Sequence, residues 1–378
     1  MANFTRKTVR HLFFLWLLLW GATASAQSYA DTEIYLQRLL DQKIADLEKT
    51  PGILIGVVLP DTTYVYSLGT VRRGADLPPT PTDVFEIGGL THLFTAALAR
   101  QLELDGRLDL NRSPNDYLPE SYHNPAAADL SLRSLLTHTS GLPRLPYEFA
   151  GRTEEAEQPF EAFTPDMVYE FYQSFPFRRS KRNYTYSPYG YAVLDLILER
   201  AGGASLEELY QIYLTEPLGL PSTRPEISTE RTRVQGYRAD GTPAPNYRFD
   251  SFRAAGSMSS TLEDLIRFVR LEMNQVPSDL YATTFQKNQI ARHPTGYERH
   301  AYIAEGWHLI IPKKKFYPVL MHTGATAGYH ADIAMVPLTG TGVVVLSNAN
   351  QPIAALAFEL LRWFNNDWRR KKVGKARL

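Results

Sequence analysis

The segment VFEIGGLTHLFTAALARQLELDGRLDL, residues 84–110, predicts a helix that begins beside two residues of chemical interest. Gly89 and His92 lie three residues apart, so they share one face of the predicted helix. A neutral imidazole near pH 7 can activate a water molecule directly. Glycine has no side-chain atom that can attack a carbonyl carbon, so the sequence excludes covalent catalysis from position 89.

Other residues also carry side chains that serve in catalysis elsewhere. His138 and Ser140 stand close together in LTHTSG, while Ser187 lacks a basic residue three positions later. Two histidines, His92 and His322, could hold a metal ion, but no third ligand stands at an obvious spacing. We therefore predict neither a metal site nor another cofactor.

The pattern of apolar residues predicts the elements that position these groups. Residues 31–49 carry apolar positions near the helical period, and Pro51-Gly52 ends the run. The segments ILIGVVLP and TYVYSLGTV flank Asp61-Thr62 and predict an antiparallel hairpin. A mainly helical pattern follows from residue 83. The segments AYIAEGWHLI, FYPVLMHTG, YHADIAMVP and GTGVVVLSN then predict strands, and residues 352–368 predict a closing helix.

These elements predict an α/β fold of the α+β type. Both chain ends, at about residues 31–82 and 295–370, would supply one antiparallel sheet flanked by helices. The intervening residues, about 83–290, would form an inserted all-helical lobe. A cleft between the sheet and this lobe is a favoured place for a ligand.

The first 26 residues have the composition of a signal peptide. Arg6, Lys7 and Arg10 precede the nine-residue apolar run LFFLWLLLW, and Ala24-Ser25-Ala26 is a small-x-small cleavage pattern. Nine apolar residues are too few to span a bilayer, which takes about 20. We therefore expect cleavage before Gln27 and a periplasmic or secreted protein, residues 27–378. The alternative is an uncleaved anchor helix.

Composition excludes several classes of function. The chain contains no cysteine, so it has no disulfide, no thiolate chemistry and no cysteine-bound zinc. Residues 1–26 hold three of the 40 basic residues and no acidic residue, so the remaining chain has 37 basic against 40 acidic residues, a net charge of −3. We expect no nucleic-acid partner and no membrane span after signal cleavage. The sequence does not predict the oligomeric state.

The segment FEIGGLTHLFTA resembles the nucleophile segment F-x-I-G-S-x-x-K-x-F-T-A of the serine β-lactamase and penicillin-binding-protein superfamily, particularly its class C β-lactamase-like esterases and peptidases. Five further segments follow in the family's order, across roughly residues 32–365: SLLTHTSGLP, YSPYGYAVLDLILERAGG, EPLGLPST, AAGSMSSTLEDLIRF and MHTGATAGYHADIAMVP. The resemblance implies a β-lactamase/transpeptidase-like fold and a serine hydrolase that acts on amide or ester bonds.

In that family the serine and lysine share a helix face, so the amine takes the hydroxyl proton while the backbone N–H at the helix start stabilises the oxyanion. The resemblance places the serine at Gly89 and the lysine at His92. Both side chains of the nucleophilic pair are therefore replaced in this sequence.

The remaining motif residues are partly kept. The tyrosine of the proton relay is Tyr186, but Pro188 stands where an asparagine would hold a substrate carbonyl. The third motif is intact as His322, Thr323 and Gly324, and the N–H of Ala325 would be the second oxyanion donor.

The resemblance also implies structural roles for the other residues that could serve in catalysis. It places His138 and Ser140 in a turn that supports the cleft, and it points Ser187 away from the cleft. The four tyrosines Tyr184, Tyr186, Tyr189 and Tyr191 would either line a groove for sugars or peptides or pack in the core. His92 is interpreted as a packed histidine bonded to Tyr186.

Three functions remain open. The first is a pseudoenzyme that has lost the nucleophile and binds a cell-wall peptide, an oligosaccharide or a small ester or amide in the kept cleft. The second is a hydrolase with displaced chemistry, in which His92, Tyr186 and His322 activate a water in the space left by the missing side chain at Gly89. The third is a structural protein without a ligand.

Overall fold

The computed structural model describes residues 38, 51–147, 158–178, 182–225, 234–311 and 317–375, with side chains up to residue 365. The predicted signal peptide lies outside the described residues, as does the helix predicted over 31–49 apart from the helical Arg38. The described residues from Pro51 onward belong to one compact unit.

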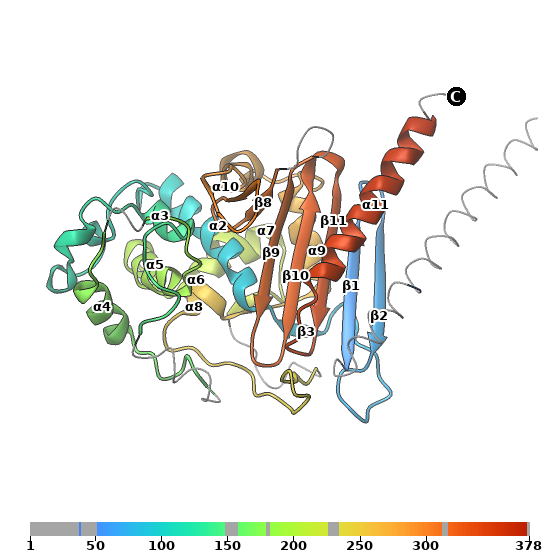
Figure 1. The fold of residues 1–378 in the computed structure, drawn as a ribbon, viewed down its shortest axis with the longest axis horizontal. Coiled ribbons are helices and arrows are strands. Elements are labelled where there is room, and N and C mark those ends of the chain that lie inside the picture. The colour runs from blue at the N-terminus through green and yellow to red at the C-terminus, as the bar shows by residue number, and fades with distance from the viewer. Residues whose placement is uncertain are drawn as a thin grey trace, which may run out of the picture. The chain divides into compact units, whose positions relative to one another are not determined.

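Eight strands form one antiparallel sheet in the order β2-β1-β11-β10-β9-β8-β7-β6, which Figure 1 shows nearly face on. The hairpin β1–β2 and the strands β7–β11 lie in the segments predicted to form strands, whereas the short strand β6 was not predicted. The strands are β1 (Gly52–Val58), β2 (Thr63–Gly69), β6 (His293–Pro294), β7 (Ala301–Ile303), β8 (His308–Ile310), β9 (Val319–Ala325), β10 (His330–Val336) and β11 (Thr341–Ser347).

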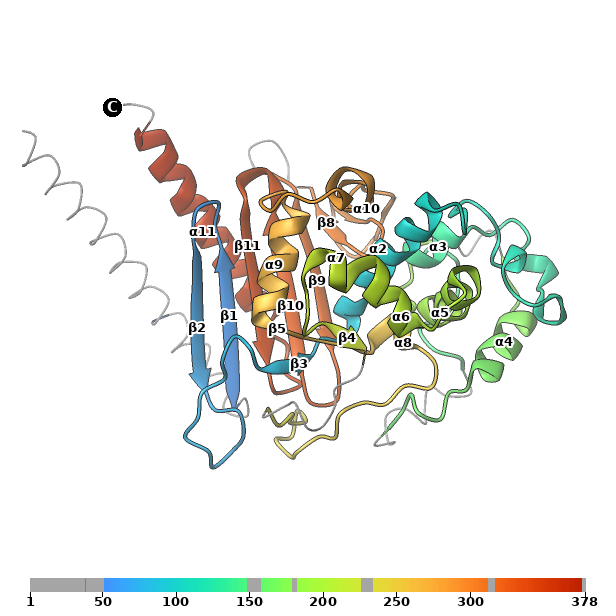
Figure 2. The same ribbon diagram turned by 180° about the vertical axis from the view of Figure 1, so that it is seen from behind.

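Helices cover both faces of the sheet. Helix α11 (Ala354–Lys375) packs on β10 and β11 and crosses the face seen in Figure 1. Helix α9 (Leu262–Glu272) packs on β1 and β11 and lies on the face seen in Figure 2. Because both faces are covered, β1, β10 and β11 are buried along their whole length, which explains their nearly continuous apolar sequences.

The inserted segment between β2 and β6 is mainly helical, but the prediction that it is all-helical is wrong. It also contains a small three-stranded sheet that the sequence analysis did not predict, because its strands are too short to show alternation. These strands are β3 (Val84–Glu86), β4 (Arg224–Pro225) and β5 (Met258–Thr261). The helices are α2 (Thr91–Leu104), α3 (Leu132–Leu136), α4 (Pro165–Ser174), α5 (Pro188–Gly202), α6 (Leu206–Tyr210), α7 (Glu216–Leu218), α8 (Arg253–Gly256) and α10 (Gln286–Asn288).

Two of these helices position the site. Helix α5 begins with the Ser187 side chain accepting a hydrogen bond from the Gly190 N–H and with Pro188 in the first turn; Gly203 ends it in a left-handed conformation. Helix α2 is buried on nearly every side and packs against α5 and α8. Its N-terminus follows the 3₁₀ turn η1 (Gly88–Leu90), which packs on β9.

Two predicted elements differ in detail. The segment AYIAEGWHLI forms two strands, β7 and β8, because Gly306 at φ +82° turns the chain between them. The closing helix extends to Lys375, beyond the predicted end at residue 368. No helix within the described ranges has the length and apolar character needed to cross a membrane.

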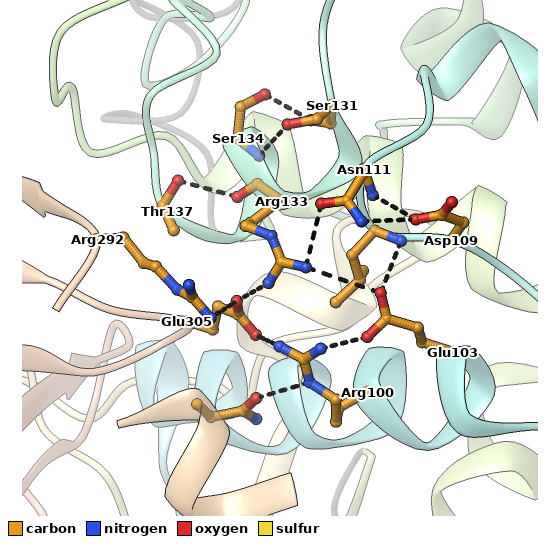
Figure 3. Close-up of polar contacts among 12 residues, drawn as sticks. Arg100, Glu103, Asp109, Asn111, Ser131, Arg133, Ser134, Thr137, Arg292 and Glu305 are labelled. Carbon is orange, nitrogen blue, oxygen red and sulfur yellow. Dashed lines mark hydrogen bonds and ion pairs between the residues drawn. The ribbon is translucent and has the colours of Figure 1, made fainter. Parts of the chain in front are cut away.

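A buried cluster of charges joins the helical insertion to the C-terminal strands. The Glu305 carboxylate is fully buried and pairs with Arg100 of α2, with Arg133 of α3, and with Arg292 at 3.0 Å. Arg100 also pairs with Glu103, one turn along α2. Figure 3 shows the three guanidinium groups converging on this one carboxylate. The cluster therefore holds together segments separated by about 200 residues of sequence.

We predict that Glu305→Gln lowers the free energy of unfolding by about 3 kcal/mol or more, because breaking a buried ion pair leaves uncompensated charges behind. Urea unfolding followed by circular dichroism measures this change. The control is Asp116→Asn, which breaks the largely exposed pair of Asp116 with Arg112 at 3.6 Å and should cost about 0.5 kcal/mol or less. Equal effects of the two substitutions would contradict a stabilising role of the cluster.

Candidate functional site

The position predicted for the lost nucleophile lies where three distant segments meet. Gly89 is in the turn η1, and a Cβ atom built on it would lie 3.0 Å from the Tyr186 hydroxyl oxygen. The same atom would lie 3.0 Å from the Thr323 carbonyl oxygen and 3.5 Å from Cε1 of His322. The motifs identified in the sequence thus converge on residue 89.

A cavity of about 860 Å³ opens at this point. Of the eight predicted site residues, six line it: Gly89, Tyr186, Pro188, His322, Thr323 and Ala325. His92 and Gly324 are not among the described residues that line the cavity.

His92 is completely buried in a group of aromatic rings. Its imidazole stacks on Tyr191 with ring centroids 3.8 Å apart, and His138 and His322 lie at 5.3 Å. Neither ring nitrogen has a hydrogen-bond partner among the described residues. The interpretation of a packed histidine is therefore confirmed, but the predicted bond to Tyr186 is wrong, because neither ring nitrogen bonds the Tyr186 hydroxyl and the two rings lie tilted with centroids 5.5 Å apart.

The pKa of His92 is lowered well below its usual value, first by burial and then by His322 and His138. His92 is therefore neutral, and it is buried and is not among the described residues that line the cavity. The structure places the His92 ring next to those of Tyr186 and His322, with centroids 5.5 Å and 5.3 Å away, but of the three only Tyr186 and His322 are among the described residues that line the cavity.

Tyr186 directly precedes helix α5 and reaches the cavity from that side. Burial raises the pKa of its hydroxyl to about 12, although the nearby Arg144 lowers it somewhat. The guanidinium carbon of Arg144 lies 5.4 Å from the centroid of the Tyr186 ring. Near neutral pH the Tyr186 hydroxyl is therefore protonated and can donate a hydrogen bond at residue 89.

His322 is fixed in one tautomer by strand β9. Its Nδ1 lies 2.9 Å from the Thr323 carbonyl oxygen, which only accepts, so Nδ1 carries the proton and Nε2 carries a lone pair. Burial, followed by the nearby His308, lowers the pKa of His322 to about 3. His308 in turn bonds through Nε2 to the Tyr184 hydroxyl at 2.7 Å. Within the described ranges, no three His, Cys, Asp or Glu side chains form a group that could hold a metal ion.

Thr323 has a buried acidic partner that sequence reasoning missed. Asp332 stands opposite Thr323 in the β9–β10 register, and its Oδ1 accepts a hydrogen bond from the Thr323 hydroxyl at 2.5 Å. Burial raises the pKa of Asp332 to about 7, while the bond from Thr323 lowers it. The available signal was an aspartate inside the apolar strand YHADIAMVP, since buried acids are rare unless paired.

The other catalytic-looking residues have structural roles, as the resemblance implied. His138 adopts φ +54°, and its Nδ1 accepts a hydrogen bond from the Ser187 N–H at 3.1 Å. The Ser187 hydroxyl donates to the Pro143 carbonyl oxygen at 2.6 Å. Ser140 is buried and accepts a hydrogen bond from the Leu142 N–H.

The tyrosine cluster divides between core and cleft. Tyr189 and Tyr191 are fully buried, and Tyr184 is buried beside His308. Of the four tyrosines only Tyr186 is among the described residues that line the cavity. Three of the four tyrosines therefore pack in the core, and one lines the predicted groove.

Glycines allow η1 and β9 to approach at backbone distance. A Cβ atom on Gly324 would lie 1.9 Å from the Ile87 carbonyl oxygen and 2.9 Å from the Gly89 nitrogen. Gly88, at φ +47°, would place a Cβ atom 2.8 Å from the Ala325 nitrogen. We name this contact of residues 87–89 with 324–325 the glycine seam. Gly89 and Ala325, the two residues whose amides are the predicted oxyanion donors, both line the cavity beside the seam.

Another part of the cavity wall is aromatic. Phe160 stacks on Phe249 with ring centroids 5.2 Å apart, and Tyr247 and Phe252 meet Phe160 at 5.6 Å and 5.5 Å. Sequence reasoning did not find this wall, because no motif marks it. The aromatic residues that line the cavity are Phe160, Tyr186, Tyr247, Phe249, Phe252, Tyr297, Tyr302 and Phe358.

Comparisons with known proteins agree with this geometry. The family model described as Beta-lactamase matches residues 40–363. A β-lactamase from Providencia stuartii is 26% identical over 267 residues, covering 68% of this chain and 66% of that protein. Penicillin-binding protein 4 from Amycolatopsis lactamdurans is 25% identical, covering 82% of this chain and 83% of that protein.

A solved class C β-lactamase from Rhodobacter sphaeroides has the same fold, with a TM-score of 0.71 and 24% sequence identity. The match covers 84% of this chain and 94% of that chain. Because the family model spans most of its length, the chain belongs to the β-lactamase family, a family of serine hydrolases. The fold prediction is therefore confirmed.

We predict that Gly324→Ala lowers the free energy of unfolding by at least about 2 kcal/mol, because the added methyl group would collide with the backbone across the glycine seam. Chemical denaturation measures the loss. In the control Gly190→Ala, the nearest atom lies at an ordinary 3.6 Å, and stability should stay equal or rise by up to about 1 kcal/mol. A Gly324→Ala protein as stable as the wild type would contradict the closeness of the seam.

We also predict that the stability difference between wild type and His322→Gln depends on pH. The folded-state pKa of about 3 lies below the value of about 6.5 in an unfolded chain, so on acidification the unfolded chain binds this proton first. The contribution of His322 is complete above about pH 6.5 and declines as pH falls, by up to about 1.4 kcal/mol per pH unit. Urea titrations of both proteins between about pH 7 and pH 5 measure it. A constant difference would contradict a buried, neutral His322.

Proposed function

We propose that this protein is an exported member of the β-lactamase family that binds its ligand in the cleft without forming an acyl-enzyme. The observation that carries the proposal is Gly89 at the point where Tyr186 and His322 converge. Covalent catalysis in this constellation needs a side-chain nucleophile at residue 89, and glycine supplies none.

The packing around residue 89 supports the same proposal. A Cβ atom there would lie 3.0 Å from both the Tyr186 hydroxyl oxygen and the Thr323 carbonyl oxygen, closer than side-chain carbons normally approach. Even the first atom of a serine side chain therefore needs its neighbours to move. The stacking of His92 on Tyr191 also fills the lysine position with rings instead of a charged amine.

The alternative of a hydrolase with displaced chemistry has less support. His92 is not among the described residues that line the cavity, which leaves His322 as the imidazole of the proposed trio that does. A general base works best when its pKa lies near the working pH, and the pKa of His322 is about 3. Proton abstraction from water by this group is weak near neutral pH.

A purely structural role leaves the cavity unexplained. A volume of about 860 Å³ lies within the range of small-molecule sites, and aromatic walls with few polar groups are typical of such sites. The relatives named β-lactamase and penicillin-binding protein suggest a cell-wall peptide, an oligosaccharide or a small ester or amide as ligand. Export is proposed from the composition of residues 1–26 alone.

We predict that the wild-type protein forms no covalent adduct with a fluorescent penicillin or a fluorophosphonate, since residue 89 offers no nucleophile. Intact-mass spectrometry after long incubation measures this, with peptide mapping of any adduct. In parallel, soluble muropeptides should raise the melting temperature, as a ligand that binds only the folded state does. A stoichiometric adduct on the peptide that contains Gly89 would overturn the proposal.

The matched variant is Gly89→Ser combined with His92→Lys. It restores both side chains of the family motif, and positioned oxyanion donors contribute about 10²–10³ in rate. We expect slow labelling at most, because the new lysine replaces a fully buried ring, and burial disfavours its charged form. Labelling of this variant but not of the wild type would tie the inactivity to these two positions.

A further inference from the structure

The cavity has an unequal distribution of polar and apolar groups. The aromatic wall of Phe160, Tyr247, Phe249 and Phe252 forms one continuous set of ring contacts. Phe252 adopts φ +63°, a conformation that bulky residues rarely adopt and that occurs at functional positions. A wall of this kind binds flat or extended apolar groups by burying their surface.

The hydrogen-bond donors are concentrated at the motif end of the cavity. There the Tyr186 hydroxyl is protonated, and Gly89 and Ala325, which meet at the glycine seam, line the cavity next to it. Arg144 adds a full positive charge over the Tyr186 ring and lies at the exposed rim of the same cavity. The other formally charged group among the described lining residues is Glu298, which is exposed next to Tyr297.

The aromatic wall and the donor end adjoin each other. The Tyr189 N–H donates to the Arg144 carbonyl oxygen at 3.3 Å, and the Tyr189 ring lies 6.1 Å from the ring of Phe252. Phe252 in turn contacts Phe160 within the wall. A ligand with an apolar body on the wall can therefore direct its polar end toward Arg144.

We propose that the cleft selects a small amphiphilic carboxylate, with an aryl or acyl body on the aromatic wall and its carboxylate at Arg144 and the glycine seam. This inference rests on the proposed function, because it assumes binding without covalent chemistry. Guanidinium groups and backbone amides bind carboxylates through charge-assisted hydrogen bonds. A polar oligosaccharide would leave most of the aromatic surface without an apolar partner.

The test uses four probes with the full-length wild-type protein in isothermal titration calorimetry at about pH 7.5, where carboxylates are ionised. Naphthylacetate has the proposed body and charge, and naphthylacetamide is its neutral counterpart. Acetate lacks the body, and naphthylethylamine reverses the charge. We expect naphthylacetate to bind about tenfold more tightly than naphthylacetamide, and acetate and naphthylethylamine to bind more weakly than both.

Two variants test the carboxylate contact and the aromatic contact separately. Arg144→Gln removes the charge at an exposed position, so the protein should fold normally while naphthylacetate binds about tenfold more weakly and naphthylacetamide is unaffected. Phe249→Ala should weaken both naphthyl ligands by a similar factor. The matched control Arg112→Gln removes another exposed arginine, outside the cavity, and should change neither affinity.

The outcomes distinguish this inference from the proposed function. If naphthylacetamide or naphthylethylamine binds as tightly as naphthylacetate, or if Arg144→Gln leaves the preference unchanged, the carboxylate assignment is wrong while the cleft remains a binding site. If no naphthyl probe binds but muropeptides stabilise the protein, the ligand is polar and the inference alone fails. If neither class binds, the inference and the proposed function both fail.

Discussion

The close backbone contact between η1 and β9 is the constraint on which the site depends. At Gly324 a side chain would overlap the Ile87 carbonyl, so the two segments can approach only because both carry glycine. This approach sets the backbone of residue 89 beside that of β9 and aligns it with His322 on the strand. Helix α5 then supplies Tyr186 from the third side. The place of residue 89 between Tyr186 and His322 is therefore held by backbone contacts and packing.

The histidines next to residue 89 make this part of the interior neutral. Four imidazoles, those of His92, His138, His308 and His322, form one buried group of ring contacts, and burial keeps the pKa of each below its usual value. The family motif would place an ammonium group at the centre of this region. A neutral interior suits an apolar ligand, whereas acyl transfer requires groups that exchange protons near neutral pH.

The sequence predicted the fold and the convergence of the motifs, because hydrophobic periodicity and motif order are local signals. It could not predict partners that depend on register: Asp332 faces Thr323 only because β9 and β10 pair as they do. The bond expected between His92 and Tyr186 was wrong for a similar reason, since the stacking on Tyr191 depends on how α2 packs against α5. The ion pairs of Glu305 and the aromatic wall could not be predicted either, because their residues come from segments that no sequence motif connects.

The order of the strands also governs how the chain can fold. Strand β1 lies between β2 and β11, and the Gly52 N–H donates to the Asn348 side chain across 296 residues of sequence. Such pairing gives the fold a high contact order. Closing so long a loop lowers the entropy of the chain before any strand contact stabilises the sheet. The N-terminal hairpin cannot find its place in the sheet until nearly the whole chain has been synthesised. A ribosome-bound fragment that ends before β11 therefore lacks the strand that closes the sheet, and its apolar β1 stays exposed to chaperones or to other chains.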